Sequence, residues 1–380
     1  SIQSTTSPAR SPGSLQTMPD PTDSSEPLSP SSQEHLELLS STFPTRVVIS
    51  DTEHRAISLD QLSRVWAFIK EHCRRWHDFF QISPTRGQAL TAEVINLYHL
   101  DAWLIRPATQ AENCSMVELM AMKPQTPQWF ISHWWGEAVH AFTTCVQRHA
   151  EIRQLPGTAC DWVCAYANRQ HALSQEVAAD PRETSFFRAL NLSEGVLLIL
   201  DEATESSGPA TPFTRIWCAF EEFVALTPSA GRPASLPRLL LDIAAAEKGT
   251  PQLLTDGVAP ADEEGARRLV AGFPAGKVRS DREKSFPLEV LRAGLTLELE
   301  KAQASMEEDR RHILNCIAGR PLDAEPLAED PSYHRVNQTL RGIFAVAGWR
   351  QAVERDIVEA LQLPEILGAA QREELVLDFT

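Results

Sequence analysis

The stretch "FFRALNLSEGVLLILD" (186–201) decides the fold class of this chain. Its first half can form a helix, and its second half is a short apolar run that ends at Asp201. A short, continuous apolar run of this kind is typical of a strand buried on both faces, as in a parallel sheet covered by helices. We therefore expect a helix followed by a central strand.

Comparable strands lie on both sides of this stretch. They are "QWFIS" (128–132), "DWVCAYA" (161–167) and "RLLLDIA" (238–244). Segments that can form helices separate them, at 137–153, 183–191 and 212–226. This alternation predicts an α/β core over residues 126–245, with a parallel sheet and helices on both of its faces.

The flanking regions have a different composition. Residues 1–40 are rich in Ser and Pro and poor in apolar residues, which predicts a disordered tail. Residues 41–125 predict a helical N-terminal extension, with a capping box formed by Ser58 and Gln61. Residues 246–380 predict a mainly helical region packed on the core, with loops near 248–262 and a further strand at "LTLELE" (295–300).

The bulk properties argue against several classes of protein. The net charge of −16 over 380 residues, without a Lys/Arg run, argues against a nucleic-acid partner. No apolar run approaches the length that spans a bilayer, and the N-terminus lacks the apolar core of a signal peptide. The seven cysteines show no CxxC motif, which predicts reduced thiols. We expect a cytoplasmic protein without a membrane partner.

Polar and aromatic side chains follow each predicted strand. In open parallel sheets, ligands bind beyond the carboxyl ends of the strands. The residues at these ends that we expect to bind a polar ligand are Ser132, His133, Trp134, Trp135, Asn168, His171 and Asp201. The alternative is that these residues only solvate the ends of loops.

The segment "TPFTRIWCAFEEF" (211–223) predicts an amphipathic helix with Thr211 as its N-cap. Its two adjacent carboxylates are not equivalent, because Glu222 lies opposite the apolar face and should be solvated. Glu221 lies at the border of that face, one turn after Trp217, where it can be partly desolvated and reach a cleft. Glu221 is therefore the candidate for chemistry, and Trp217 joins the expected binding residues. The alternative for Glu221 is a flank residue in a surface ion pair.

The order "FIS" (130–132), "FFRALNLSEGVLLIL" (186–200) and "RIWCAFEEF" (215–223) resembles the TIR (Toll/interleukin-1 receptor) domain. It looks closest to divergent TIR-like proteins of single-celled eukaryotes. The resemblance covers residues 126–245, about a third of the chain, and implies a flavodoxin-like sheet. The flanks match no TIR element.

The resemblance also implies a chemistry. In enzymatic TIR domains, the Glu three residues after the Cys of the WC motif is catalytic, and here that position is Glu221. Those enzymes cleave the bond between nicotinamide and ribose in NAD⁺, so NAD⁺ is the expected substrate and no cofactor is needed. A carboxylate can stabilise the oxocarbenium-like ribose that forms. Trp134 or Trp135 can stack on a ring of the substrate, and Ser132 and His133 border the same cleft. Other TIR domains are non-catalytic and act through homotypic assembly, which is the alternative and implies a homo-oligomer.

Two other site chemistries find little support in the sequence. A Cys-His hydrolase needs a nucleophilic Cys at a strand end, but Cys164 falls within the predicted strand 161–167 and reads as core. The histidines show no spacing typical of metal ligands, and we predict no metal site.

Overall fold

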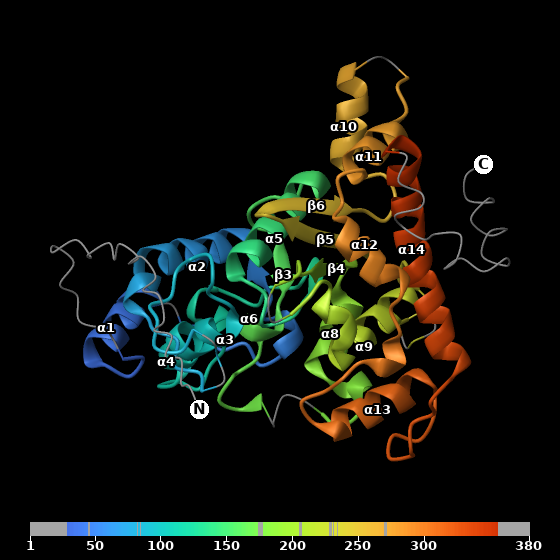
Figure 1. Cartoon of the computed structure of the whole chain (residues 1–380). Coiled ribbons are helices and arrows are strands. Elements are labelled where there is room, and N and C mark those ends of the chain that lie inside the picture. Colours follow the sequence, from blue (N-terminus) through green and yellow to red (C-terminus); the bar gives the residue numbers. More distant parts are fainter. Residues whose placement is uncertain are drawn as a thin grey trace, which may run out of the picture.

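The computed structural model shows an α/β protein built around one sheet (Figure 1). It describes residues 29–44, 46–81, 83, 85–173, 178–204, 207–227, 230, 232–233, 235–269 and 272–355. The prediction of disorder for residues 1–28 lies outside this part of the chain.

The six strands lie in the order β1-β3-β2-β4-β5-β6. The inner strands β3 (Cys160–Trp162), β2 (Trp129–Ser132), β4 (Gly195–Leu200) and β5 (Leu240–Glu247) are parallel. The edge strands β1 (Ile57–Ser58) and β6 (Thr250–Leu254) pair antiparallel to β3 and β5. If β2 is counted as the first strand, the order β3-β2-β4-β5-β6 becomes 2-1-3-4-5, which is the flavodoxin-like order. The predicted α/β fold is confirmed.

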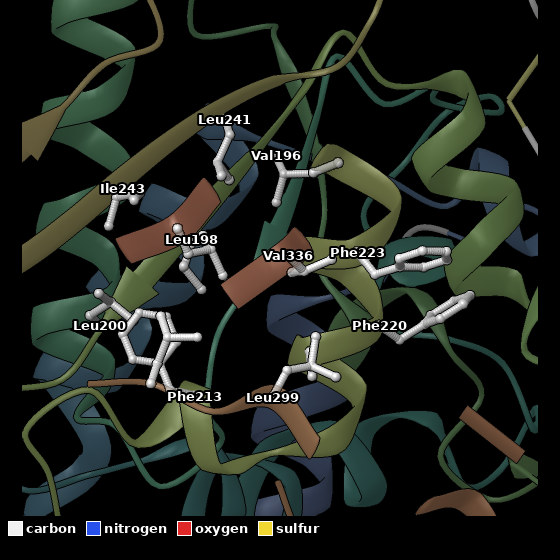
Figure 2. Packing of buried hydrophobic residues seen from close by; sticks show 14 of the residues in the cluster. Val196, Leu198, Leu200, Phe213, Phe220, Phe223, Leu241, Ile243, Leu299 and Val336 are labelled. Atoms are coloured by element: carbon white, nitrogen blue, oxygen red, sulfur yellow. The ribbon is translucent and has the colours of Figure 1, made fainter. Parts of the chain in front are cut away.

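Both faces of the sheet are largely apolar, because alternate residues of β2, β4 and β5 enter two different cores. Val196, Leu198 and Leu200 of β4 point into one core, and Leu197 and Ile199 point into the other. Figure 2 shows the first core, which contains β4 and β5 side chains together with Phe213, Phe220 and Phe223.

Several helices of the described residues cover the first core. They are α8 (Ser185–Leu192), α9 (Ile216–Leu226), α12 (Leu288–Leu295), α13 (Glu307–Ile317) and α14 (Pro331–Arg355). The second core is covered mainly by α1 (Gln33–Thr42), α2 (Leu59–His72), α3 (Leu97–Leu100) and α5 (Val139–Arg153). The other α-helices within the described residues are α4 (Arg106–Thr109), α6 (Cys164–Ala167), α10 (Pro260–Leu269) and α11 (Ala275–Glu283).

The flanking regions are part of the same structure as the core. β1 comes from the N-terminal extension and β6 comes from the C-terminal region, so the sheet extends beyond residues 126–245 on both sides. The capping box of Ser58 and Gln61 at the start of α2 is confirmed. A buried carboxylate, Glu118, ties the extension to the loop after β3 by accepting hydrogen bonds from Arg169 over 2.7 and 3.1 Å.

Three local predictions were wrong. Residues 33–40 belong to α1, whose Leu39 is buried, although the sequence predicted disorder up to residue 40. The segment 295–300 forms no strand, and a 3₁₀ turn covers Leu299–Lys301 because Leu299 is needed in the core beside α14. The additional strand is β6, which lies in the segment 248–262, for which the sequence predicts a loop.

Within the described residues, we find no helix long and apolar enough to cross a membrane.

Candidate active site at the carboxyl ends of the strands

The candidate site lies where β2 and β4 end next to each other. These two strands are parallel neighbours with Ser132 opposite Leu198, so the residues after Ser132 and after Leu200 emerge at one edge of the sheet. The chain leaves β2 and β4 toward opposite sides of the sheet order, which makes this edge the topological switch point. Ligands of open α/β sheets bind at such a point.

The structure brings Glu221 of α9 to the carboxyl end of β2. Glu221 is 5% exposed, and its carboxyl group lies near the Ser132 hydroxyl, which forms no hydrogen bond of good geometry within the described residues. Burial raises the pKa of Glu221 to about 8, and the Ser132 hydroxyl opposes this rise. Glu221 is therefore mostly protonated near neutral pH when the site holds no cation.

Two thiols flank this pair. Cys164 at the start of α6 and Cys218 on α9 both lie close enough to Glu221 for its charge to raise their pKa values. Burial is the larger cause, and it brings the pKa of Cys164 to about 12. Cys218 donates from Sγ to the His133 carbonyl oxygen over 3.7 Å, which ties α9 to the loop after β2. Neither thiol has the low pKa of a nucleophile.

The prediction that Glu222 is solvated was wrong. The side chain is buried, with 1% of the residue exposed, and burial together with the neighbouring Glu221 raises its pKa well above the usual range. The physical reason is that helices of the C-terminal region cover the outer side of α9. Trp217 on α9 donates from Nε1 to Asp309 Oδ2 of α13 over 3.2 Å, so α9 has no solvent-exposed face at this level.

The loop after β2 carries three aromatic side chains. His133 is buried against Phe142, and burial lowers its pKa to about 4, so the ring is neutral. The Trp134 ring lies over Gly136, where an added Cβ would come within 2.2 Å of it. Trp135 donates from Nε1 to Cys164 Sγ over 3.2 Å, which places its indole beside the Glu221 site. Both tryptophans are half-buried.

Sequence reasoning missed Glu137 in the same loop. Both of its carboxyl oxygens are buried without a hydrogen-bond partner among the described residues. Burial, with a contribution from Asp201, raises its pKa well above the usual range. Asp201 itself accepts two hydrogen bonds of 2.6 Å from the backbone N–H and the hydroxyl of Thr211. The signal for Glu137 was its position in a strand-end loop, the same signal that selected Asp201.

Three of the predicted binding residues make other contacts. Asn168 Oδ1 accepts a hydrogen bond from the Ser185 hydroxyl at the start of α8. His171 is exposed, and its Nε2 lies 3.0 Å from the Arg106 carbonyl oxygen. The Trp217 ring stacks on Phe186 at 5.1 Å. The site thus brings together Ser132, His133, Trp135 and Glu221, while Trp217 packs between α8 and α13.

Two local predictions near the site were also wrong. Cys164 is the first residue of α6 and not part of a strand, because β3 ends at Trp162. Thr211 does not cap α9, since it begins a separate 3₁₀ turn (Thr211–Thr214) and is held by Asp201.

In the part of the chain that the structure describes, no three His, Cys, Asp or Glu side chains are arranged to hold a metal ion. An open hollow of about 450 Å³ lies between α2 and α5, lined by residues such as Leu62 and Val146, and thus away from Glu221.

Comparisons of the chain with protein-family models, with curated proteins and with solved structures found no match. The resemblance to TIR domains therefore depends on the quoted motifs alone.

Proposed function

We propose that this protein is a TIR-like NAD⁺ nucleosidase that cleaves the bond between nicotinamide and ribose in the cytoplasm. One observation carries the proposal: Glu221 lies beside Ser132 at the carboxyl end of β2. The sequence motif selected Glu221, and the strand-end rule independently selected Ser132. Two residues selected on different grounds therefore lie at one place in the fold.

The protonation of Glu221 fits a reaction that begins with a cationic substrate. With a pKa of about 8 the group is mostly neutral in the free protein. The nicotinamide ring of NAD⁺ is positively charged, and a cation nearby favours the carboxylate form. When neutral nicotinamide leaves, the positive charge moves onto the ribose, where the carboxylate of Glu221 stabilises it. In a buried site this interaction is stronger than in water.

The neighbouring side chains have supporting roles in this proposal. The Ser132 hydroxyl orients the Glu221 carboxylate, and Trp135 offers an aromatic face for a ring of the substrate. His133, which is neutral and buried, shapes the wall of the site. The protonated Glu222 adds no second negative charge next to Glu221.

The test is the release of nicotinamide from NAD⁺ by the purified protein at high concentration. Glu221→Gln is compared with Glu222→Gln, a matched control on the next position of the same helix. We expect Glu221→Gln to lose activity by about 100-fold or more, as for other groups that stabilise charge in the transition state. Glu222→Gln should keep most of the activity, because Gln is neutral like the protonated Glu222. Absence of nicotinamide release by the folded wild-type protein would overturn the proposal.

A second candidate is a non-catalytic module that assembles with further copies of itself. The burial of Glu221 favours it, since a site with 5% exposure leaves little room for a dinucleotide in the described conformation. Light scattering over a range of protein concentrations tests this candidate. Concentration-dependent oligomers combined with no NAD⁺ cleavage would support it over the enzyme.

A further inference from the structure

Residues 94–98 of the N-terminal extension run antiparallel to the loop that leads from β2 into α5. Asn96 and Ala138 form an antiparallel bridge. Val139 donates its backbone N–H to the Ile95 carbonyl oxygen over 2.8 Å, and Leu97 donates to the Trp135 carbonyl oxygen over 3.0 Å. We call residues 94–98 the strap. It is paired to the loop that carries half of the candidate site.

A chain of side-chain contacts leads from the strap to Glu221. The Tyr98 ring packs on Trp135, with 5.6 Å between the ring centroids. Trp135 in turn donates its hydrogen bond to Cys164, and Cys164 lies beside Glu221. The strap therefore fixes the indole that covers this side of the site.

The extension also contacts the loop after α6. Arg169 donates to the Glu118 carboxylate, and His171 meets the Arg106 carbonyl oxygen. Residues of the extension thus reach the loops that follow two neighbouring strands, β2 and β3. A segment that closes the carboxyl ends of β2 and β3 has to cover both of these loops.

The strap has both anchored and exposed side chains. Ile95 and Leu97 are fully buried in the second core, whereas Val94 is 50% and Tyr98 41% exposed. The buried pair makes the closed form the resting state, because opening would expose both to water. Two backbone hydrogen bonds, at Trp135 and Val139, join the strap to the loop. Because they are few, the binding energy of a ligand can drive the strap away from the loop.

We propose that the strap is a built-in lid, which must leave the loop after β2 before a nucleotide can reach Glu221. The identity of the nucleotide rests on the proposed NAD⁺ cleavage, but the movement of the strap does not. In this arrangement the N-terminal extension regulates the site, and its release from residues 135–139 is the opening step.

A disulfide between positions 96 and 138 tests the lid in the full chain. Because Val139 donates to Ile95, Asn96 and Ala138 form a non-hydrogen-bonded pair. The Cα atoms of such pairs lie about 4.5 Å apart in antiparallel ladders, which suits a disulfide. The variant Asn96→Cys/Ala138→Cys is oxidised to lock the strap and reduced to release it. The two single variants are the controls for the loss of the Asn96 cap of α3 and of Ala138.

The readout is alkylation of Cys164 and Cys218 by a maleimide, resolved by peptide mass spectrometry. We expect the lock to slow labelling of these two thiols by about tenfold, and reduction to restore it. Cys316 on α13 is the internal reference and should label equally in both forms. Equal labelling of Cys164 and Cys218 in the locked and released forms would overturn the lid.

NAD⁺ cleavage by the same two forms separates this inference from the proposed function. Slower labelling with no cleavage in either form supports the lid and contradicts the enzyme. Cleavage at the same rate in both forms contradicts the lid and supports the enzyme. If the double variant does not fold, Tyr98→Ala replaces it, because removing the ring from Trp135 should speed labelling of Cys164 several-fold. An unchanged rate in Tyr98→Ala would overturn the lid.

Discussion

Arg153 of α5 donates two hydrogen bonds to the carboxylate of Asp242 in β5, over 2.8 and 2.6 Å. Asp242 is fully buried, and His149 Nε2 lies 3.1 Å from its Oδ2 atom. These partners hold the pKa of the Asp242 carboxyl below its usual range in spite of burial. The network joins α5 to the sheet below the candidate site, and so positions the helix that follows the loop of His133 and Glu137.

Replacing Asp242 should therefore be costly. Asp242→Ala leaves the Arg153 guanidinium buried and uncompensated, and we expect a loss of about 3–5 kcal/mol in the free energy of unfolding. Asp281→Ala is the control, because the Asp281 side chain is about half exposed and its ion pairs with Lys277 and Lys284 lie at the surface, so the variant should cost less than about 1 kcal/mol. Urea unfolding measures both. Similar losses in the two variants would contradict the role of the network.

Gly136 is required for the position of the Trp134 ring. In Gly136→Ala the new Cβ would lie 2.2 Å from a ring carbon, so the indole or the loop must shift. We expect a loss of about 1–3 kcal/mol in stability, as for other overpacked sites. Gly342→Ala in α14 is the control, since nothing lies within 4 Å of its Cβ position. It should stabilise the helix by about 0.5–1 kcal/mol. Thermal unfolding of the two variants distinguishes these opposite signs.

Buried acids should make the protein less stable at alkaline pH. Burial raises the pKa of Asp161 in β3 to about 8, whereas in the unfolded chain it ionises near pH 4. The folded state thus holds a proton that the unfolded state releases, and the associated stability is lost as the pH rises from about 4 to about 8. Between about pH 5.5 and pH 8, Asp161 alone should account for a loss of about 1–3 kcal/mol.

Asp161→Asn provides the test of this pH dependence. The amide remains neutral at every pH, so the variant should lose less stability than the wild type between mildly acidic and alkaline conditions. Denaturant unfolding at both ends of the range measures the difference. An identical pH dependence in the two proteins would show that Asp161 ionises normally in the folded state.

The fold could be predicted from the sequence because each strand is indicated by residues that are adjacent in the chain. Each inner strand is a short apolar run, and such runs indicate burial on both faces wherever they occur. Glu221 could be selected in a similar way, because the helical period of residues 211–223 places it at the border of the apolar face. Ser132 and Asp201 could be selected because the end of an apolar run indicates the end of a strand.

Features that depend on distant parts of the chain were not predictable in this way. The burial of Glu222 depends on C-terminal helices that cover α9, and the period of α9 carries no information about them. The strap depends on pairing between residues 94–98 and 135–139, whose own sequences contain no repeated strand pattern. β6 was missed because Pro251 and the nearby Gly residues indicate a loop, although an edge strand tolerates Pro.

The pH dependence of NAD⁺ cleavage tests the central claim, that the ionised Glu221 carboxylate promotes the reaction. The pH dependence of kcat/KM reports the pKa of the essential group in the free enzyme. We predict that kcat/KM rises between about pH 6 and about pH 9 and levels off with an apparent pKa of about 8, the value that burial gives Glu221. A kcat/KM that does not change across this range, or the absence of cleavage at every pH, would contradict the account.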